Sequence, residues 1–400
     1  MTLWQLIKAE IRSVLTNPVV ILTVFGGVVF YSFLYPLPYA QQTPREQPIA
    51  VVNLDGSQTS LKLERMVDAT PQVKIVSRLH TVEDAKQAFL NREITGFLVI
   101  PEHFYKDVML GKSPTLAYAA DASYFLVYGT VVEGLAQAGG TLGAQVKVSK
   151  MVIEGVPLSL ASHNYSAIKL NMKPTFNPTM GYIEYVVPAV FVLILQQTLI
   201  MAVGLQTGSQ RHGRGYWSQV STGSLLLVRT LVFVAIYYLL SAYYFGFSFE
   251  RLSVNHIAKA GELLTMLFPF LLGCCGLGFW LGYLLPRREL VTLVVLVSSM
   301  PLIFLAGFIW PVESIPAPLL WIADLSPSTW AIKGFLALNQ MGATWQQVAK
   351  HWTALWLLVA LWGGVAYWIA KRNNKPVVTE SLSQFFSAAQ RDKLTEITIP

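Results

Sequence analysis

The sequence predicts a polytopic α-helical membrane protein with six transmembrane helices, an α/β extracytoplasmic domain between spans 1 and 2, and a re-entrant hairpin after span 5. Three observations support this fold class. Of the 400 residues, 54% are hydrophobic and only 13% are charged, whereas a soluble domain carries roughly 25% charged residues. Uncharged apolar runs recur at lengths that cross a hydrocarbon core of about 30 Å. One long polar stretch of different character interrupts them.

Residues 1–17 are predicted to form an amphipathic interfacial helix. Apolar residues recur at helical spacing from Leu3 to Leu15, and the charged residues Lys8, Glu10 and Arg12 lie between them. This pattern is typical of a helix that lies on a membrane surface.

The polar stretch, residues 39–181, is predicted to form a periplasmic α/β domain with a long helical stalk. Short apolar strands alternate with helices, which is the pattern of a small α/β layer domain. From Ser123 to about Gly155 a helical pattern leads the chain away, and Lys169 to Thr179 leads it back. The expected strands lie near residues 49–52, 73–76, 97–100 and 115–118, and the expected helices cover residues 60–69 and 81–91.

Six apolar runs make up the predicted spans, five of them in a bundle over residues 182–371. The first run is too long for a signal-peptide core and lacks a small-residue cleavage site, so we expect it to be retained. Glu184 and Arg229 lie at the ends of runs, where we expect their charges to reach the interface. The spans cover residues 18–38, 183–205, 225–249, 261–285, 290–312 and 351–371.

Lys and Arg residues beside the span ends predict the orientation. With the N-terminus inside, nine of them lie on the cytoplasmic side and four in the short outer loops, so both termini are expected in the cytoplasm. The inner residues are Lys8, Arg12, Arg211, Arg214, Arg287, Arg288, Lys371, Arg372 and Lys375, and the outer ones are Arg251, Lys259, Lys333 and Lys350. This distribution, rather than a basic face, accounts for the net charge of +7 and argues against nucleic-acid binding.

Residues 313–341 are predicted to form the re-entrant hairpin. Proline residues divide this stretch into apolar pieces too short to span a bilayer, and such backbone is tolerated where it is buried or lines a cavity. Ser326-Pro327 is typical of a helix start, with Ser as N-cap and Pro at the first helical position.

The chain lacks the residues of an internal energy source. No G-x-x-x-x-G-K-[ST] motif occurs. No carboxylate or histidine lies as a proton relay within the uncharged cores of the spans, which are residues 19–37, 186–205, 230–249, 263–285, 290–312 and 352–370. The histidines lack metal-ligand spacing, the adjacent Cys274 and Cys275 suit packing, and no catalytic constellation is present. Energy for transport would therefore arrive through a partner.

Polar residues inside the spans are the candidates for a substrate path: Gln196, Gln197, Ser298 and Ser299. The mid-span amides Gln196 and Gln197 either bond a neighbouring helix or face a cavity.

Three stretches carry a resemblance to a known family. They are Ile94-Thr95-Gly96-Phe97-Leu98-Val99-Ile100-Pro101-Glu102-His103-Phe104, then Phe176-Asn177-Pro178 with Val187-Pro188, and Leu305 to Pro316 continuing through Leu325-Ser326-Pro327. In this order they resemble the membrane subunit of ATP-binding-cassette (ABC) exporters of the type-2 permease family, in the subfamily with a large insert after span one. The resemblance covers nearly the whole chain.

The resemblance implies a half-transporter. Two permease copies, identical or paralogous, would pair among membrane lipids in a bacterial inner membrane, and two ABC ATPase subunits would supply ATP and Mg; this chain would bind no cofactor itself. A periplasmic adaptor is a further expected partner. The loop 206–223 would contact the ATPase through Arg211, His212, Arg214 and Gly215, although the family's interleaved acidic residues are absent. The hairpin would form an exit gate with Trp310, Pro311, Glu313, Pro316, Trp321 and Pro327.

The leading hypothesis is therefore the permease of an ATP-driven exporter of a hydrophobic or amphipathic substrate such as a drug or lipid. A membrane-anchored sensor, with the α/β domain as its ligand-binding module, is the alternative; only the tail 372–400 would be available for its output. A membrane enzyme is a third class, and turnover of a lipid by the isolated chain would reveal it.

Overall fold

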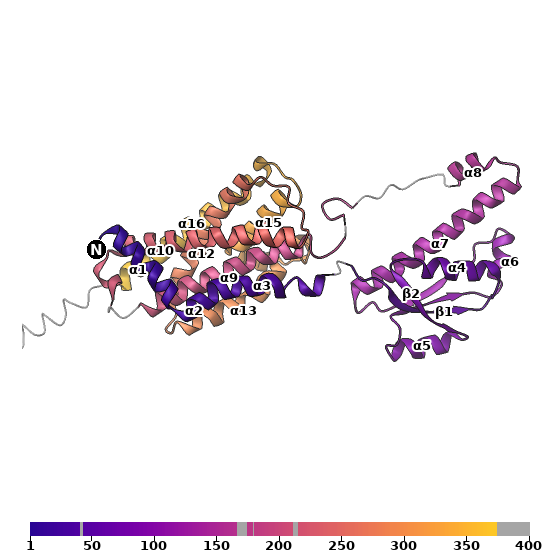
Figure 1. The fold of residues 1–400 in the computed structure, drawn as a ribbon, viewed down its shortest axis with the longest axis horizontal. Helices are drawn as coiled ribbons and strands as arrows, with labels where there is room; N and C mark the ends of the chain where they lie inside the picture. Colours follow the sequence, from indigo (N-terminus) through magenta and orange to yellow (C-terminus); the bar gives the residue numbers. More distant parts are fainter. Residues whose placement is uncertain (41–42, 166–173, 179, 211–214, 374–400) are drawn as a thin grey trace, which may run out of the picture. The chain divides into compact units, whose positions relative to one another are not determined.

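The computed structural model describes residues 1–40, 43–165, 174–178, 180–210 and 215–373 (Figure 1). The chain divides into two compact units: residues 1–40 together with 181–400, and residues 41–180.

The unit of residues 41–180 contains a four-stranded sheet of order β2-β1-β3-β4, in which β1 is parallel to β2 and β3 while β4 is antiparallel to β3. The predicted alternation of strands and helices is confirmed, with ends that differ by a few residues. The strands are β1 Gln47–Asn53, β2 Val73–Leu79, β3 Gly96–Ile100 and β4 Ala117–Ala120. The helices are α4 Gln58–Asp68, α5 Val82–Leu90, α6 Phe104–Met109, α7 Phe125–Ile153 and α8 Leu158–Asn164.

Helices cover both faces of this sheet. Side chains of β1 alternate between the faces, as the period of two in a strand requires. Ile49 and Val51 face the core beneath α4 and α7, whereas Ala50 and Val52 face the core beneath α5. The unit thus has its own two-sided hydrophobic core. The long helix α7 extends beyond the sheet (Figure 1), and its role as a stalk stays a prediction.

Among the described residues, five helical segments are long and apolar enough to cross a membrane, judged by length and composition. They are Pro18–Tyr39, Val186–Ser209 (α9), Thr222–Arg251, Ala260–Leu284 (α12) and Trp345–Arg372. The first comprises α2 Pro18–Ile21, the π-helical turn η1 Leu22–Gly26, α3 Gly27–Leu34 and the 3-10 turn η2 Leu37–Tyr39. The third comprises α10 Thr222–Ala242, the π-helical turn η4 Tyr243–Ser248 and α11 Phe249–Arg251, and the last belongs to α16 Trp345–Asn373.

Helix α9 is the centre of this helical unit. Nearly all of its residues are buried, and it packs against α12, α13 and α15. Only 22% of the most apolar window of each of the segments Pro18–Tyr39 and Trp345–Arg372 is buried in the isolated chain. Apolar residues that a single chain leaves exposed are what lipid or a second subunit would cover.

The predicted boundary of the fifth span is wrong. Helix α13 covers Glu289–Leu305 and has 17 residues, whereas the apolar run continues to Val312. The backbone leaves the helix because Gly307 adopts a φ of +83°, a conformation that favours glycine, and Pro311 then begins the 3-10 turn η5 Val312–Ser314. Apolar composition alone did not reveal this end, and a crossing by α13 stays a prediction.

The predicted broken hairpin is present as two short helices. Helix α14 covers Ala317–Asp324 and helix α15 covers Pro327–Asn339, with Ser326 at the N-cap position and Pro327 at the first helical position. Most of α15 is buried against α9, α12 and α16. The start of α15 is therefore buried in protein, whereas the irregular stretch 307–316 and most of α14 are exposed or half-buried.

Helix α1, Leu3–Thr16, is not free on its apolar side. Leu6 and Val14 are buried, and Leu6 packs in one cluster with Val228 of α10. Leu3, Trp4, Ile11 and Leu15 stay exposed on other faces of α1. The predicted amphipathic helix is thus confirmed as a helix, but part of its apolar surface contacts protein.

Candidate functional site

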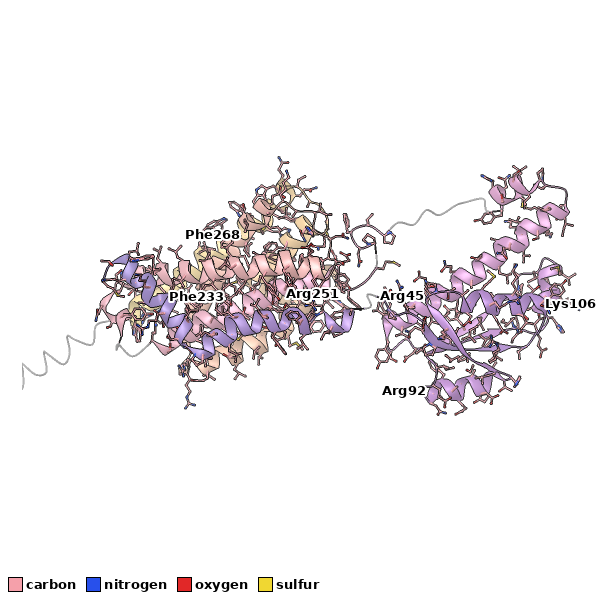
Figure 2. All side chains as sticks on the ribbon, viewed as in Figure 1. Arg45, Arg92, Lys106, Phe233, Arg251 and Phe268 are labelled. Atoms are coloured by element: carbon pink, nitrogen blue, oxygen red, sulfur yellow. The ribbon has the colours of Figure 1, made fainter. Side chains whose placement is uncertain are left out.

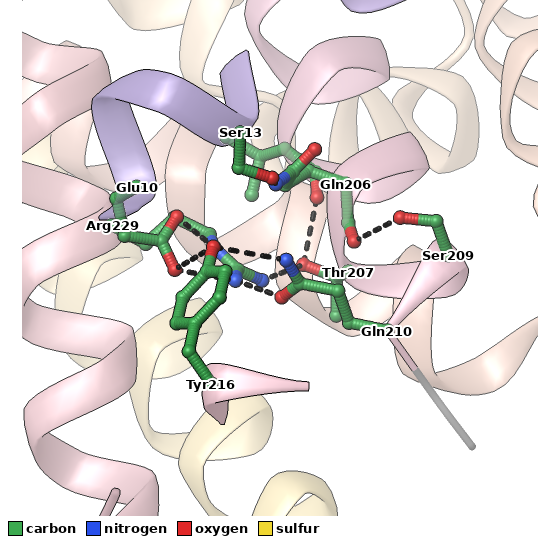
Figure 3. Close-up of polar contacts among 9 residues, drawn as sticks. Glu10, Ser13, Gln206, Thr207, Ser209, Gln210, Tyr216 and Arg229 are labelled. Atoms are coloured by element: carbon green, nitrogen blue, oxygen red, sulfur yellow. Dashed lines mark hydrogen bonds and ion pairs between the residues drawn. The ribbon is translucent and has the colours of Figure 1, made fainter. Parts of the chain in front are cut away.

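A fully buried ion pair joins the N-terminal helix α1 to α10. Arg229 donates from Nε to Glu10 Oε2 at 3.0 Å and from Nη2 to Glu10 Oε1 at 2.8 Å (Figure 3). The Glu10 and Arg229 side chains are 0% and 1% exposed. A two-point contact of this kind between guanidinium and carboxylate fixes both the distance and the orientation of the two helices.

The expectation that Arg229 reaches the interface is wrong, and so is the placing of Glu10 among the surface charges of α1. Glu10 lies four residues from both Leu6 and Val14, so it shares their face of the helix. When that face packs on α10, the carboxylate is carried into the protein. A carboxylate four residues from two apolar residues of the same helix face was therefore the sequence signal that Glu10 is buried and needs a cationic partner.

Three further polar side chains complete the contacts of the pair. Arg229 donates to Thr207 Oγ1 at 3.4 Å and to Gln210 Oε1, and Gln210 Nε2 donates to Tyr216 Oη at 3.1 Å. Tyr216 Oη donates to Glu10 Oε1 at 3.0 Å, which closes the ring. Burial, and then the negative charge of Glu10, raise the pKa of Tyr216, so its hydroxyl keeps the proton that it donates.

This group, hereafter the Glu10–Arg229 network, ties together four segments: α1, the end of α9, the turn η3 Tyr216–Gln219 and α10. Gln206 also donates to Ser13 Oγ, which adds a second bond between α9 and α1 (Figure 3). The network therefore includes three residues of the loop 206–223 that was predicted to contact a partner: Thr207, Gln210 and Tyr216. Any displacement of α1 or of η3 breaks buried charge-assisted hydrogen bonds, so these elements can move only together with α9 and α10.

Of the four predicted coupling-loop residues, Arg211, His212 and Arg214 lie outside the described residues. Gly215 precedes η3 with a φ of +152°, and a Cβ built there would lie 2.4 Å from ring atoms of Trp217. Only glycine fits this position without displacing the indole ring. The loop also remains helical as far as Ser209, so α9 extends beyond the predicted span end at residue 205.

The mid-span residue Gln196 bonds a neighbouring helix, which was one of its two expected roles. Its Oε1 accepts from the Ser328 backbone N–H at 2.6 Å, and its Nε2 donates to Ser326 Oγ at 2.9 Å. Ser326 holds the N-cap position of α15, yet its hydroxyl makes no capping bond. A side chain from α9 thus caps the hairpin helix in place of the predicted serine.

The other residues of the predicted substrate path are not brought together around a cavity. Gln197 is half-buried beside Gln196, and Ser298 is exposed. Ser299 is 4% exposed and donates to the Val295 carbonyl of its own helix at 2.6 Å. Their role in a path stays a prediction. Within the described part of the chain, no group of three His, Cys, Asp or Glu side chains is placed to hold a metal ion.

The predicted gate residues lie on the hairpin with very different exposure. Trp310 is 57% exposed and Trp321 is 70% exposed, and Glu313 is exposed in η5. Pro311 and Pro316 precede η5 and α14, and Pro327 is buried at the start of α15. The hairpin thus has a buried base, held by Gln196, and an exposed edge that carries two indole rings.

A bundle of long apolar helices around the buried short helix α15 is the architecture of a polytopic helical membrane protein. Comparison with known proteins agrees: the family described as "ABC-2 family transporter protein" matches residues 18–368, and the chain belongs to this family. A curated relative from Escherichia coli strain K12, the "Probable multidrug ABC transporter permease YbhR", is 22% identical over 386 residues, covering 92% of this chain and 98% of the relative. The same-named protein of Escherichia coli O157:H7 matches equally.

Proposed function

We propose that this chain is the permease subunit of an ATP-driven exporter that moves a hydrophobic or amphipathic substrate outward across a bacterial inner membrane. Membership of the ABC-2 family supports a transport subunit that works with an ATPase partner and a second permease. The relatives' printed name, a probable multidrug permease, favours an amphipathic drug-like substrate.

The Glu10–Arg229 network is the observation that carries this proposal. A permease that takes its energy from a partner needs a stiff connection between the surface that the partner moves and the membrane helices. The network joins α1 and η3 to α9, the central helix of the bundle, through buried hydrogen bonds. Because α9 also caps α15, a displacement at α1 or η3 has a direct mechanical route to the hairpin.

The orientation and the remaining partners complete the proposal. Both termini lie in the cytoplasm, Mg-ATP binds only the partner subunits, and the α/β unit lies outside, where an adaptor would dock. The hairpin edge with Trp310 and Trp321 forms the exit gate between two permease copies.

Co-purification and ATP hydrolysis test the coupling. The chain is expressed with a candidate ABC ATPase subunit from the same genome, and hydrolysis by the reconstituted complex is measured with and without a substrate dye. We expect the Arg211→Ala, Arg214→Ala double variant to lose substrate-stimulated hydrolysis. If no ATPase co-purifies, or if hydrolysis by the double variant is unchanged, the coupling assignment is wrong.

A further inference from the structure

A second buried acid lies at the other end of α9. Glu184 is 3% exposed, two residues before the helix begins, and accepts hydrogen bonds from the backbone N–H and the Nδ2 of Asn255, both at 3.3 Å. Both donors are neutral and both bonds are long. The expectation that Glu184 reaches the interface is therefore wrong, as it was for Arg229.

Glu184 differs from Glu10 because no cation balances it. Within the described residues, no Lys, Arg or His nitrogen lies within 4.0 Å of its carboxylate. Arg251, labelled in Figure 2 and four residues before Asn255, instead places its guanidinium 4.5 Å from the ring centroid of Phe33. A buried carboxylate without a counter-charge is costly, and at the edge of a membrane it marks a functional site.

Two side-chain amide oxygens without a hydrogen-bond partner among the described residues belong to Asn339 and Gln340, which contact the carbonyl of Asn255. Asn339 Nδ2 and Gln340 Nε2 both donate to the Asn255 carbonyl, at 3.4 and 2.9 Å. Their amide oxygens are buried and have no hydrogen-bond partner in the described structure, and the two residues are 3% and 5% exposed. A buried acceptor that lacks a donor is rare. Together with Glu184, these two amides place acceptor oxygens on residues that contact Asn255.

Four tyrosines form a row of neighbouring rings, and two of them lie close to Glu184 in the sequence. The ring centroids follow one another at 5.8 Å from Tyr35 to Tyr39, 5.3 Å from Tyr39 to Tyr182 and 5.9 Å from Tyr182 to Tyr185. Tyr182 and Tyr185 flank Glu184 in the sequence, and all four rings are half-buried. Aromatic faces attract cations through their quadrupole and also shield apolar groups from water.

We infer that Glu184 and the Tyr35–Tyr39–Tyr182–Tyr185 chain form a recognition site for the positively charged head of an amphipathic organic cation. The carboxylate supplies the counter-charge, the tyrosine rings hold the apolar groups around the cation, and the amide oxygens of Asn339 and Gln340 accept from any N–H of the head group. This inference rests on the proposed function, because it names the class of substrate that the permease carries.

Binding to the purified full-length permease in nanodiscs tests the site without the ATPase. The probes are tetraphenylphosphonium, a permanent lipophilic cation, and the uncharged triphenylphosphine oxide. Glu184→Gln is expected to weaken binding of the cation at least tenfold, since it removes a charge-assisted contact, and to leave binding of the neutral probe unchanged. The matched control is Glu250→Gln, which alters an exposed carboxylate of α11.

Tyr39→Leu is a second test that leaves Glu184 unchanged, so it stays informative if Glu184→Gln fails to fold. We expect Tyr39→Leu to weaken cation binding about two- to thirtyfold, because it removes one aromatic face. Equal cation binding by wild type and Glu184→Gln would overturn the inference. A second outcome would also overturn it. If Na⁺ or Ca²⁺ stabilises the wild type but not Glu184→Gln against unfolding, and the variant binds tetraphenylphosphonium as the wild type does, the site belongs to an inorganic ion. If no ATPase co-purifies, or if hydrolysis by the Arg211→Ala, Arg214→Ala variant is unchanged, the proposed coupling is refuted while these binding results stay intact.

Discussion

At the residue scale, the Glu10–Arg229 pair makes the sharpest prediction about stability. Replacing Arg229 by Met leaves a buried carboxylate without its counter-charge, which costs about 3–5 kcal/mol. Replacing both residues, as Glu10→Met with Arg229→Met, removes both charges and is expected to recover much of that loss. Thermal unfolding of the purified variants in detergent measures the difference.

The exposed pair Arg288–Glu289 is the control for this experiment, because both of its side chains are largely open to solvent. Glu289→Gln should shift the unfolding temperature far less than Arg229→Met, since water screens such pairs. If Arg229→Met unfolds no earlier than Glu289→Gln, the ion pair does not hold α1 in place.

Gln196 supports a second prediction at this scale. Gln196→Leu leaves the Ser328 N–H and the Ser326 hydroxyl without their partner, at a cost of about 1–3 kcal/mol. Gln197→Leu alters the half-buried neighbour and serves as the control. Hydrogen exchange at the first amides of α15 should accelerate in Gln196→Leu alone. Equal protection in both variants would show that Gln196 is not the cap of this helix.

The polar residues were only partly predictable. Sequence spacing put Glu10 on the same face as Leu6 and Val14, but nothing local shows which protein surface that face contacts. Gln196 was recognised as a mid-span amide with two expected roles, and its partner Ser328 is 132 residues away in the chain. Contacts at such separations follow from the packing of helices, which a single sequence does not encode locally.

At the scale of elements, strands and long apolar helices were predictable because hydrophobic periodicity acts within a few turns. The α/β alternation and the short hairpin helices followed from this periodicity and from the proline positions. The end of α13 could not be predicted in this way, because the helix ends before Gly307 although the sequence stays apolar to Val312. The positive φ of Gly307 ends the helix, and a hydropathy pattern contains no information about backbone conformation.

The hairpin edge gives a prediction at this scale. A cysteine at the exposed position 321, introduced as Trp321→Cys in a background without Cys274 and Cys275, is expected to cross-link the two permease copies and to block transport while the complex stays assembled. ATP-dependent dye uptake into inverted vesicles, in which export runs from the medium into the lumen, measures the block before and after reduction. Uptake that continues at full rate with the cross-link formed would rule out a gate at this edge.

At the scale of the whole molecule, the unit of residues 41–180 has a core separate from that of the helical unit. We therefore predict that a fragment covering this unit folds on its own and unfolds cooperatively, as compact domains of this size do. Circular dichroism during thermal unfolding checks this. A gradual, non-cooperative loss of signal would mean that the unit depends on the membrane helices.

The short helix α13 has a consequence for the lipid around the protein. Its 17 residues extend about 25 Å, less than the roughly 30 Å of a bilayer core. Its surface carries exposed apolar side chains, among them Leu293, Val297 and Met300. If α13 crosses the membrane, hydrophobic mismatch compresses the adjacent acyl chains at a cost that rises with bilayer thickness. A thinned annulus of this kind would shorten the path of an amphipathic molecule beside α13 and would make the rate of export depend on acyl-chain length.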